Sequence, residues 1–232
     1  MYLLVSAMNP SGVMRRTVIP ELLDTDAGSA HEIECSLADL RRINRWFGGA
    51  STTIDLVRRI ARTRNCAELS LLEVAAGCGD VPETARRALA RERIDLAITL
   101  LDRSSKHMNG AHSKVIANAL ALPFRDSAFD LVSCSLFAHH LEPDQLRHFA
   151  AECLRVARVA VVINDLVRDP LHLALVYAGM PLYRSRITRH DAPASVRRAY
   201  TPDEMRNMVK GLTTRIEITR HYLFRMGVIL WK

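Results

Sequence analysis

The sequence predicts an α/β fold in which helices cover a mostly parallel sheet, and three observations support this prediction. An apolar segment of strand length, 69–75, leads into a loop of small residues and then into the helix-forming segment 80–90. Further apolar strand-length segments alternate with helical ones downstream, an order typical of parallel strands joined by crossover helices. Two strand-like segments, 215–222 and 224–231, follow one another at the C-terminus and predict an antiparallel hairpin.

Length and composition favour one globular domain with an extension. The chain has 232 residues, of which 49% are hydrophobic and 25% charged, and its formal net charge is +7 without any long run of like charges. The five cysteines are odd in number and form no C-x-x-C pair, so we expect reduced thiols and a cytoplasmic location. Residues 1–8 are apolar but short and lack a basic start, so neither a signal peptide nor a transmembrane helix is expected.

The first 65 residues are predicted to form a helical extension. Segment 36–47 has apolar residues close to a 3.6-residue period, with Ser36 as the candidate N-cap and two glycines at its end. A second helix is expected from Ser51 onward. These helices either cover the sheet or form a lid over a bound ligand.

The small-residue loop between the first strand and its helix is a candidate binding element. Gly77 and Gly79 let the backbone approach a ligand closely, and Pro82 fits the first turn of the helix that follows. The N-terminus of that helix would then face the ligand. Asp102 follows the second apolar strand, 94–101. A carboxylate there can accept both hydroxyls of a ribose, or it can cap a helix over 103–110.

Three motifs resemble those of the class I S-adenosylmethionine-dependent methyltransferases. They are the loop Glu73-Val-Ala75-Ala-Gly77-Cys-Gly79-Asp80, the segment Leu122-Pro123-Phe124 with Phe129-Asp130, and His139-His140-Leu141. The resemblance covers about 69–165 and is nearest to the small-molecule branch that includes ubiquinone and menaquinone biosynthesis methyltransferases. Two positions depart from the family pattern. Ala75 replaces a glycine, which is compatible with close approach if its φ is negative, and Asn118 replaces an acid.

The resemblance implies a Rossmann-like, seven-stranded, mostly parallel sheet with a C-terminal antiparallel hairpin. Residues 66–232 would form the S-adenosylmethionine-binding domain, with residues 1–65 as a helical extension or lid. The cofactor would be S-adenosylmethionine. The residues expected to bind it are Glu73, Ala75, Gly77, Gly79, Asp102, Arg103, Asn118, Ala119 and Ser135.

The acceptor implied by the resemblance is a small phenolic, quinone-like or polyketide-derived molecule, methylated on oxygen or carbon. His140 and His190 are the candidate bases, and the candidate substrate residues are His139, Arg197 and Tyr200. We expect segment 184–200 to be a polar insertion that roofs the acceptor pocket. As metal ligands the adjacent histidines lack third and fourth partners at a recognisable spacing, so no metal is expected.

Four other functions compete with this one. An NAD-dependent enzyme would carry a glycine where Pro82 stands. A nucleic-acid methyltransferase acting on base amino groups would carry an Asn/Asp-Pro-Pro-aromatic segment, which Ser135-Leu-Phe-Ala does not match, so no nucleic-acid partner is expected. A protein methyltransferase or a non-catalytic protein that only binds the cofactor remains open, the latter because of Ala75 and Asn118. We expect a monomer or a homodimer.

Overall fold

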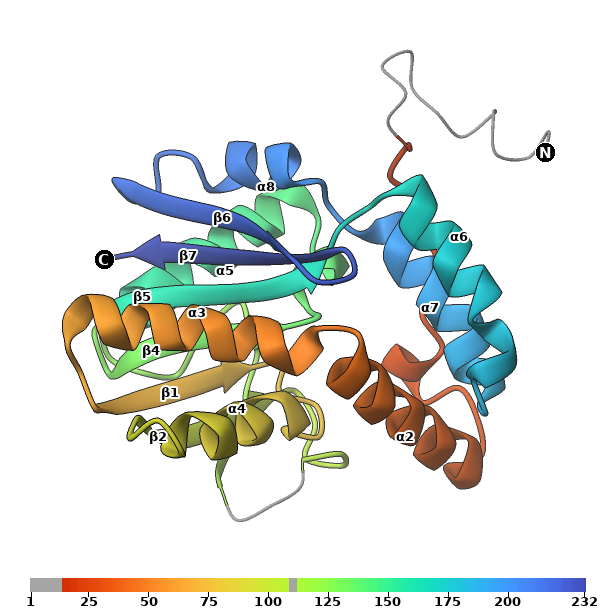
Figure 1. Ribbon diagram of the computed structural model, residues 1–232, viewed down its shortest axis with the longest axis horizontal. Helices are drawn as coiled ribbons and strands as arrows, with labels where there is room; N and C mark the ends of the chain where they lie inside the picture. Colours follow the sequence, from red (N-terminus) through yellow and green to blue (C-terminus); the bar gives the residue numbers. More distant parts are fainter. Residues whose placement is uncertain (1–13, 109–111) are drawn as a thin grey trace.

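A seven-stranded sheet forms the centre of the molecule (Figure 1). The computed structural model describes residues 14–108 and 112–232. Its strands lie in the order β3-β2-β1-β4-β5-β7-β6. They are β1 Glu68–Val74, β2 Asp95–Asp102, β3 Ser113–Ile116, β4 Phe129–Ser135, β5 Ala157–Leu166, β6 Arg215–His221 and β7 Arg225–Trp231. The first five are parallel and β7 is antiparallel to both of its neighbours, which confirms the predicted Rossmann-like fold with its C-terminal hairpin.

The helices form one layer on each face of the sheet and a cap beyond the carboxyl ends of its parallel strands. They are α2 Ala30–Trp46, α3 Gly49–Arg64, α4 Asp80–Ala90, α5 Pro143–Val156, α6 Pro170–Ala178, α7 Arg186–Arg198 and α8 Pro202–Val209, with short 3-10 turns η1 Leu23–Thr25, η2 Ala138–His140 and η3 Met180–Leu182. Helices α3 and α4 share one apolar core with the sheet, and α5 and α8 share another. Helices α2, α6 and α7 lie together beyond the carboxyl ends of the parallel strands (Figure 1).

The central strands are apolar on both faces because helices cover both faces. In β4 and β5, residues 131–134 and 160–163 are all buried, and all of them except Ser133 are apolar. Continuous apolar strands of this kind are typical of parallel sheets. The carboxyl ends of β1, β2, β4 and β5 therefore open toward the cap, which is where open α/β sheets place their ligands.

Helix α2 begins earlier than the sequence pattern predicts. Its N-cap is Ser29, which forms a reciprocal capping box with Glu32; Ser36, the predicted cap, lies buried inside the helix and its hydroxyl contacts that of Thr188 at 3.1 Å. The Ser29 box satisfies two free backbone N–H groups at once, so it outcompetes the later serine. Helix α3 likewise begins at Gly49, before Ser51.

The predicted polar insertion is mostly a regular helix. Segment 186–198 forms α7 despite Pro193 in its interior, and Ser185 caps its N-terminus. Its many arginines and its proline suggested a polar insertion, but the helix has a buried apolar face that includes Ile187 and Val196. The helix expected over 103–110 is not formed by residues 103–108, and 109–111 lie outside the described residues.

The two helices of the predicted N-terminal extension lie in different parts of the molecule. Helix α3 packs against the sheet through Val57 and Ile60, which are fully buried. Helix α2 packs against α7 and belongs to the cap. Residues 1–13 lie outside the described residues. Among the residues that are described, none of the helices combines the length and the apolar character that crossing a bilayer requires.

Candidate active site

One large pocket lies between the carboxyl ends of the strands and the cap. Its volume is about 1460 Å³. Eight of the nine residues predicted to bind the cofactor line it: Glu73, Ala75, Gly77, Asp102, Arg103, Asn118, Ala119 and Ser135. Gly79, the ninth, is not in the lining. It is the N-cap of α4 with a φ of 74°, and a Cβ there would lie 2.8 Å from the Leu100 Cδ1 atom, so any side chain at this position would be strained.

Asp102 fixes the shape of the small-residue loop. Its Oδ2 atom accepts a hydrogen bond of 2.9 Å from the Gly77 N–H, and its Oδ1 atom accepts one of 3.2 Å from the Ser104 N–H. Gly77 has a φ of 52° and open space where a Cβ would stand. Ala75 has a φ of 55°, not the negative value that the sequence analysis required for a harmless replacement. It therefore holds a strained left-handed conformation.

Glu73 lies at the floor of the pocket. Its side chain is buried, the Ser133 hydroxyl donates a hydrogen bond to its Oε2 atom, and burial raises the pKa of its carboxyl to about 7 although that hydroxyl opposes the shift. The Ser135 hydroxyl further along β4 lies close enough to the same carboxyl to oppose that shift as well, but it is buried and makes no hydrogen bond of ordinary geometry among the described residues. A buried carboxyl beside an unpartnered hydroxyl can receive the polar, cationic part of a ligand.

Asn118 lines the same end of the pocket. Its Oδ1 atom accepts a hydrogen bond of 2.9 Å from the Leu120 N–H. This bond holds the turn after β3 and orients the amide. Ala119 and Ile116 line the pocket beside it, and they offer backbone and apolar contacts to a flat ring.

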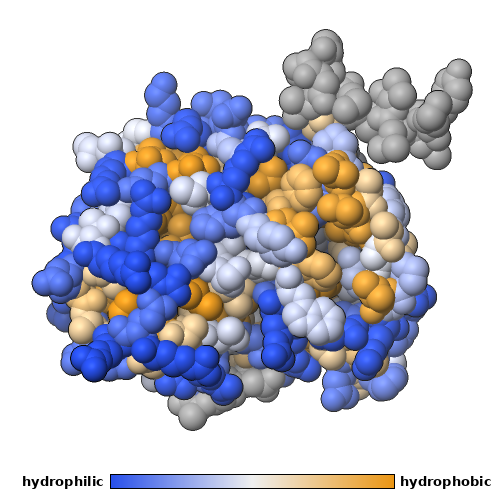
Figure 2. Space-filling model, viewed as in Figure 1, coloured by the Kyte–Doolittle hydropathy of each residue, from blue (hydrophilic) through white to orange (hydrophobic). Residues whose placement is uncertain are grey.

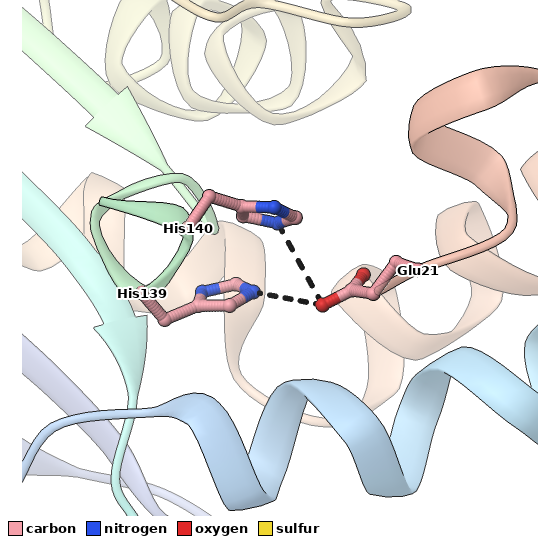
Figure 3. Close-up of side chains that lie close together, drawn as sticks. All are labelled: Glu21, His139 and His140. Carbon is pink, nitrogen blue, oxygen red and sulfur yellow. Dashed lines mark ion pairs between the residues drawn. The ribbon is translucent and has the colours of Figure 1, made fainter. Parts of the chain in front are cut away.

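Two adjacent histidines face a glutamate at the other end of the pocket (Figure 3). The Nδ1 atom of His139 lies 2.7 Å from Asp165, which also accepts the His139 backbone N–H at 2.8 Å. The Nδ1 atom of His140 lies 3.1 Å from Asp24. The two Nε2 atoms approach the same oxygen, Oε1 of Glu21, at 3.5 Å and 3.8 Å.

The histidines and carboxylates of this cluster stabilise each other's charged forms. Burial would lower the pKa of His139, but Asp165 and Glu21 outweigh it and raise that pKa to about 9. Burial likewise would raise the pKa of Glu21, but His139 and His140 lower it. Glu21 and Asp24 come from the segment around η1, which the sequence analysis did not single out. No local motif marks them, and only the fold brings them to the histidines.

Three predicted acceptor residues lie outside the pocket lining. The side chain of His190 is 42% exposed and contacts Asp191, Arg197 donates to the Tyr177 hydroxyl at 2.7 Å, and the buried Tyr200 hydroxyl donates to the Leu141 carbonyl at 2.6 Å. Because α7 is a helix, only one of its faces reaches the pocket. That face supplies other residues: Ala192, Ser195, Val196 and Arg198.

The acceptor end has mostly apolar walls and a buried cation that the sequence analysis missed. Helices α2 and α6 contribute Leu37, Leu40, Ile43, Leu175 and Val176. Arg225 at the start of β7 also lines the pocket and is 2% exposed. It donates to the Phe47 carbonyl at 3.2 Å, and its Nη1 atom has no partner among the described residues. Burial lowers the pKa of Arg225 to about 10.

Known proteins share this fold and part of the sequence. Residues 72–162 match a family of methyltransferase domains. No curated protein is similar enough in sequence to count as a match. The methyltransferase match and the fold support a class I S-adenosylmethionine-dependent methyltransferase, an enzyme whose cofactor is S-adenosylmethionine.

Solved structures of methyltransferases resemble the whole architecture. The plantazolicin methyltransferase BpumL, solved with S-adenosylhomocysteine, is 12% identical, with a TM-score of 0.68 over 91% of this chain and 94% of that one. A protein of an antibiotic biosynthesis pathway from Anabaena variabilis, described as a methyltransferase, is 17% identical, with a TM-score of 0.51 over 71% of this chain and 64% of that one. At sequence identities this low, the similarity shows a shared fold and nothing more.

Proposed function

We propose that this methyltransferase modifies a small, largely apolar molecule that carries a phenolic, quinone-like or polyketide-derived group. The observation that carries the proposal is the pocket. Its volume of about 1460 Å³ exceeds the roughly 300–1,000 Å³ that small-molecule sites commonly have. A polar end with the glycine loop and an apolar end with the histidines give room for a cofactor and an acceptor together.

The chain's own residues fit the cofactor at the polar end. We assign Glu73 and the glycine loop to its amino-acid part, Asp102 to the ribose hydroxyls, and Asn118 with Ala119 to the adenine. Bound there, S-adenosylmethionine supplies an electrophilic methyl group on a positively charged sulfur. The unpartnered Ser135 hydroxyl and the buried Glu73 carboxyl are polar groups that a ligand at this end would satisfy.

An apolar acceptor fits the other end. Leu175 and Leu182 line the pocket and are also 45% and 67% exposed, so apolar surface continues from inside the pocket to the outside. Figure 2 shows apolar side chains gathered on the surface where α6 lies. BpumL was solved with azole-containing analogues of desmethylplantazolicin, which agrees with a pocket of this fold taking a bulky unsaturated molecule. We propose that α2, with α6 and α7, acts as the lid over this end.

His140 is the proposed base for the acceptor proton. Its Nδ1 atom contacts Asp24, its side chain is 18% exposed, and it lines the pocket. If Nδ1–H donates to Asp24, the Nε2 atom is left with a free lone pair toward the acceptor. His139 is held by Asp165 and would position its neighbour. A general base of this kind contributes about 10²–10⁴-fold to the rate.

The test is transfer of labelled methyl groups from S-adenosylmethionine to a panel of phenols and hydroxyquinones, with peptides and tRNA as rival acceptors. We expect transfer to a phenolic compound. His140→Asn should lower kcat by at least about 100-fold and leave S-adenosylhomocysteine binding unchanged, and His190→Gln, outside the pocket, should keep both. Transfer only to peptide or tRNA, or cofactor binding without transfer to any acceptor, would refute the proposal.

A further inference from the structure

We propose that Glu21, His139 and His140 form a binding site for a divalent transition-metal cation of the Zn²⁺ or Co²⁺ type at the acceptor end of the pocket. The site would give the methyltransferase a way to hold a hydroxyl or phenolic oxygen of its acceptor. This use rests on the proposed function. Binding of the ion itself does not, because it depends only on three side chains of the cluster.

The donor atoms are arranged as metal ligands with supporting carboxylates. His139 and His140 each direct Nδ1 to a carboxylate, Asp165 at 2.7 Å and Asp24 at 3.1 Å, and each directs Nε2 toward Glu21 (Figure 3). In metal sites a ligating histidine almost always donates its second ring N–H to such a partner, which fixes the ring and leaves the other nitrogen free for the ion. Two imidazoles and one carboxylate are a donor set for first-row transition metals.

The distances suit an ion better than a direct hydrogen bond. Glu21 Oε1 lies 3.5 Å from Nε2 of His139 and 3.8 Å from Nε2 of His140, and all three donor atoms lie within 4.8 Å of one another. Both distances are longer than an N–H···O bond of ordinary strength. Donors that share a tetrahedral ion at about 2.0–2.1 Å lie about 3.4 Å apart, so shifts of a few tenths of an ångström would complete the site.

An unpartnered buried nitrogen points into the same place. His139 is 2% exposed, and its Nε2 atom has no hydrogen-bond partner among the described residues. A polar atom buried in this way needs a partner. Asp165 and Glu21 raise the pKa of His139 to about 9, so an ion would bind Nε2 by displacing its proton. The Ser195 hydroxyl donates to Glu21 Oε1 at 2.8 Å and fixes the carboxylate.

The neighbouring cation contacts His140 at atoms that would not bind the ion. Arg198 donates to the His140 backbone oxygen and lies 3.5 Å from Nδ1. Three protein ligands leave a fourth position open, as catalytic metal sites require. Since all three residues line the pocket, that position is available to an acceptor oxygen, whose pKa a bound dication would lower. With an ion present, His140 is a ligand and not the base.

The experiment measures metal binding directly. Tag-free protein carrying Cys35→Ser, which removes the surface His31–Cys35 pair at 3.6 Å, is stripped with chelator and titrated with Co²⁺ by visible absorption, then with Zn²⁺ in competition. We expect one ion per chain. Glu21→Gln and His140→Gln should each weaken binding by more than about 100-fold, since even loss of an outer carboxylate costs 10–100-fold. His190→Gln, a histidine with its own carboxylate partner outside the pocket, should bind like the parent.

The outcomes separate the two proposals. No stoichiometric binding, or equal affinity in the parent and in Glu21→Gln, overturns the metal site and leaves a water or a hydrogen-bonded imidazole pair there. Circular dichroism and S-adenosylhomocysteine binding by calorimetry establish that each variant is folded. If the parent binds Co²⁺ through Glu21 but binds no S-adenosylhomocysteine, the metal site stands and the proposed function fails.

Discussion

The stability of the fold and the binding of a cationic ligand should both depend on pH through Glu73, because its carboxyl group is buried. Its pKa of about 7 in the folded chain lies above the ordinary 4.5, so the folded state holds a proton that the unfolded state loses between those values. The stability that this proton provides is complete below about pH 4.5 and is lost as the pH rises through 7. A cationic ligand would favour the charged form and release the proton.

We expect Glu73 by itself to lower the free energy of unfolding by on the order of 3 kcal/mol between pH 4.5 and pH 8. Glu73→Gln should remove that part, because the amide does not titrate. Urea unfolding at a series of pH values gives the comparison. Parallel pH profiles for the parent and Glu73→Gln would contradict the shifted pKa.

Ala75 carries a cost that glycine would avoid. Its φ of 55° disfavours any side chain by roughly 1–2 kcal/mol, and a β-branched residue is a clear outlier there. We expect Ala75→Val to lower the free energy of unfolding by more than about 1 kcal/mol, and Ala75→Gly to leave it equal or up to about 1 kcal/mol higher. Denaturant melts measure both. A valine variant as stable as the glycine variant would contradict the strained conformation.

Asp102 has two roles in the structure, holding the loop and facing the pocket. Asp102→Ala removes the acceptor of the Gly77 N–H as well as the proposed ribose contact. Hydrogen bonds to charged groups contribute about 1.5–3 kcal/mol each, so we expect S-adenosylhomocysteine to bind about 10–100-fold more weakly by calorimetry. Asp95→Ala, exposed at the start of the same strand, is the control. Unchanged affinity in Asp102→Ala would sink the ribose assignment.

At the scale of elements, α7 holds the segment that carries Glu21. The two oxygens of Asp191 accept the backbone N–H groups of Leu22 and Leu23 at 2.8 Å and 3.0 Å. Asp39 on α2 accepts those of Arg184 and Ser185 before α7 at 2.8 Å and 3.0 Å. Buried carboxylates thus join α2, η1 and α7 into one cap, and the histidine cluster depends on that join.

Removing one of these carboxylates should loosen the cap alone. In Asp191→Ala we expect faster amide hydrogen exchange over residues 20–26 and unchanged exchange in β1, β4 and β5, because the sheet has its own cores. His190→Ala removes the neighbouring imidazole and keeps both acceptors, so its exchange should match the parent. Faster exchange throughout the sheet would show that the cap and the sheet unfold together.

At the scale of the whole molecule, the cofactor should stabilise the fold through residues from several strands. Ligand at 100 times its Kd adds about 2.7 kcal/mol to the free energy of unfolding. For a chain of this size, that raises Tm by about 5–10 °C. Thermal melts with S-adenosylhomocysteine and with NADH check it. A shift with NADH and none with S-adenosylhomocysteine would contradict the cofactor assignment.

The sequence by itself determined the sheet and the polar end of the pocket. Apolar strands alternating with helices, the glycine loop and Asp102 are local patterns, and a parallel sheet aligns the carboxyl ends of its strands without further information. Eight of the nine residues expected to bind the cofactor line the pocket for that reason. The ninth, Gly79, serves the packing of α4 on β2 instead.

Which residues line the acceptor end of the pocket was decided only by the tertiary structure. The cap joins segments that are far apart in the chain. Glu21, Asp24 and Arg225 therefore reach the pocket although no local sequence motif identifies them. The same folding turned His190 and Arg197 away from the pocket, because α7 is a helix that presents only one face to it, whereas the sequence analysis predicted a polar insertion. Local patterns specify strands and turns, whereas contacts between distant side chains depend on how helices pack, and no short stretch of sequence encodes that packing.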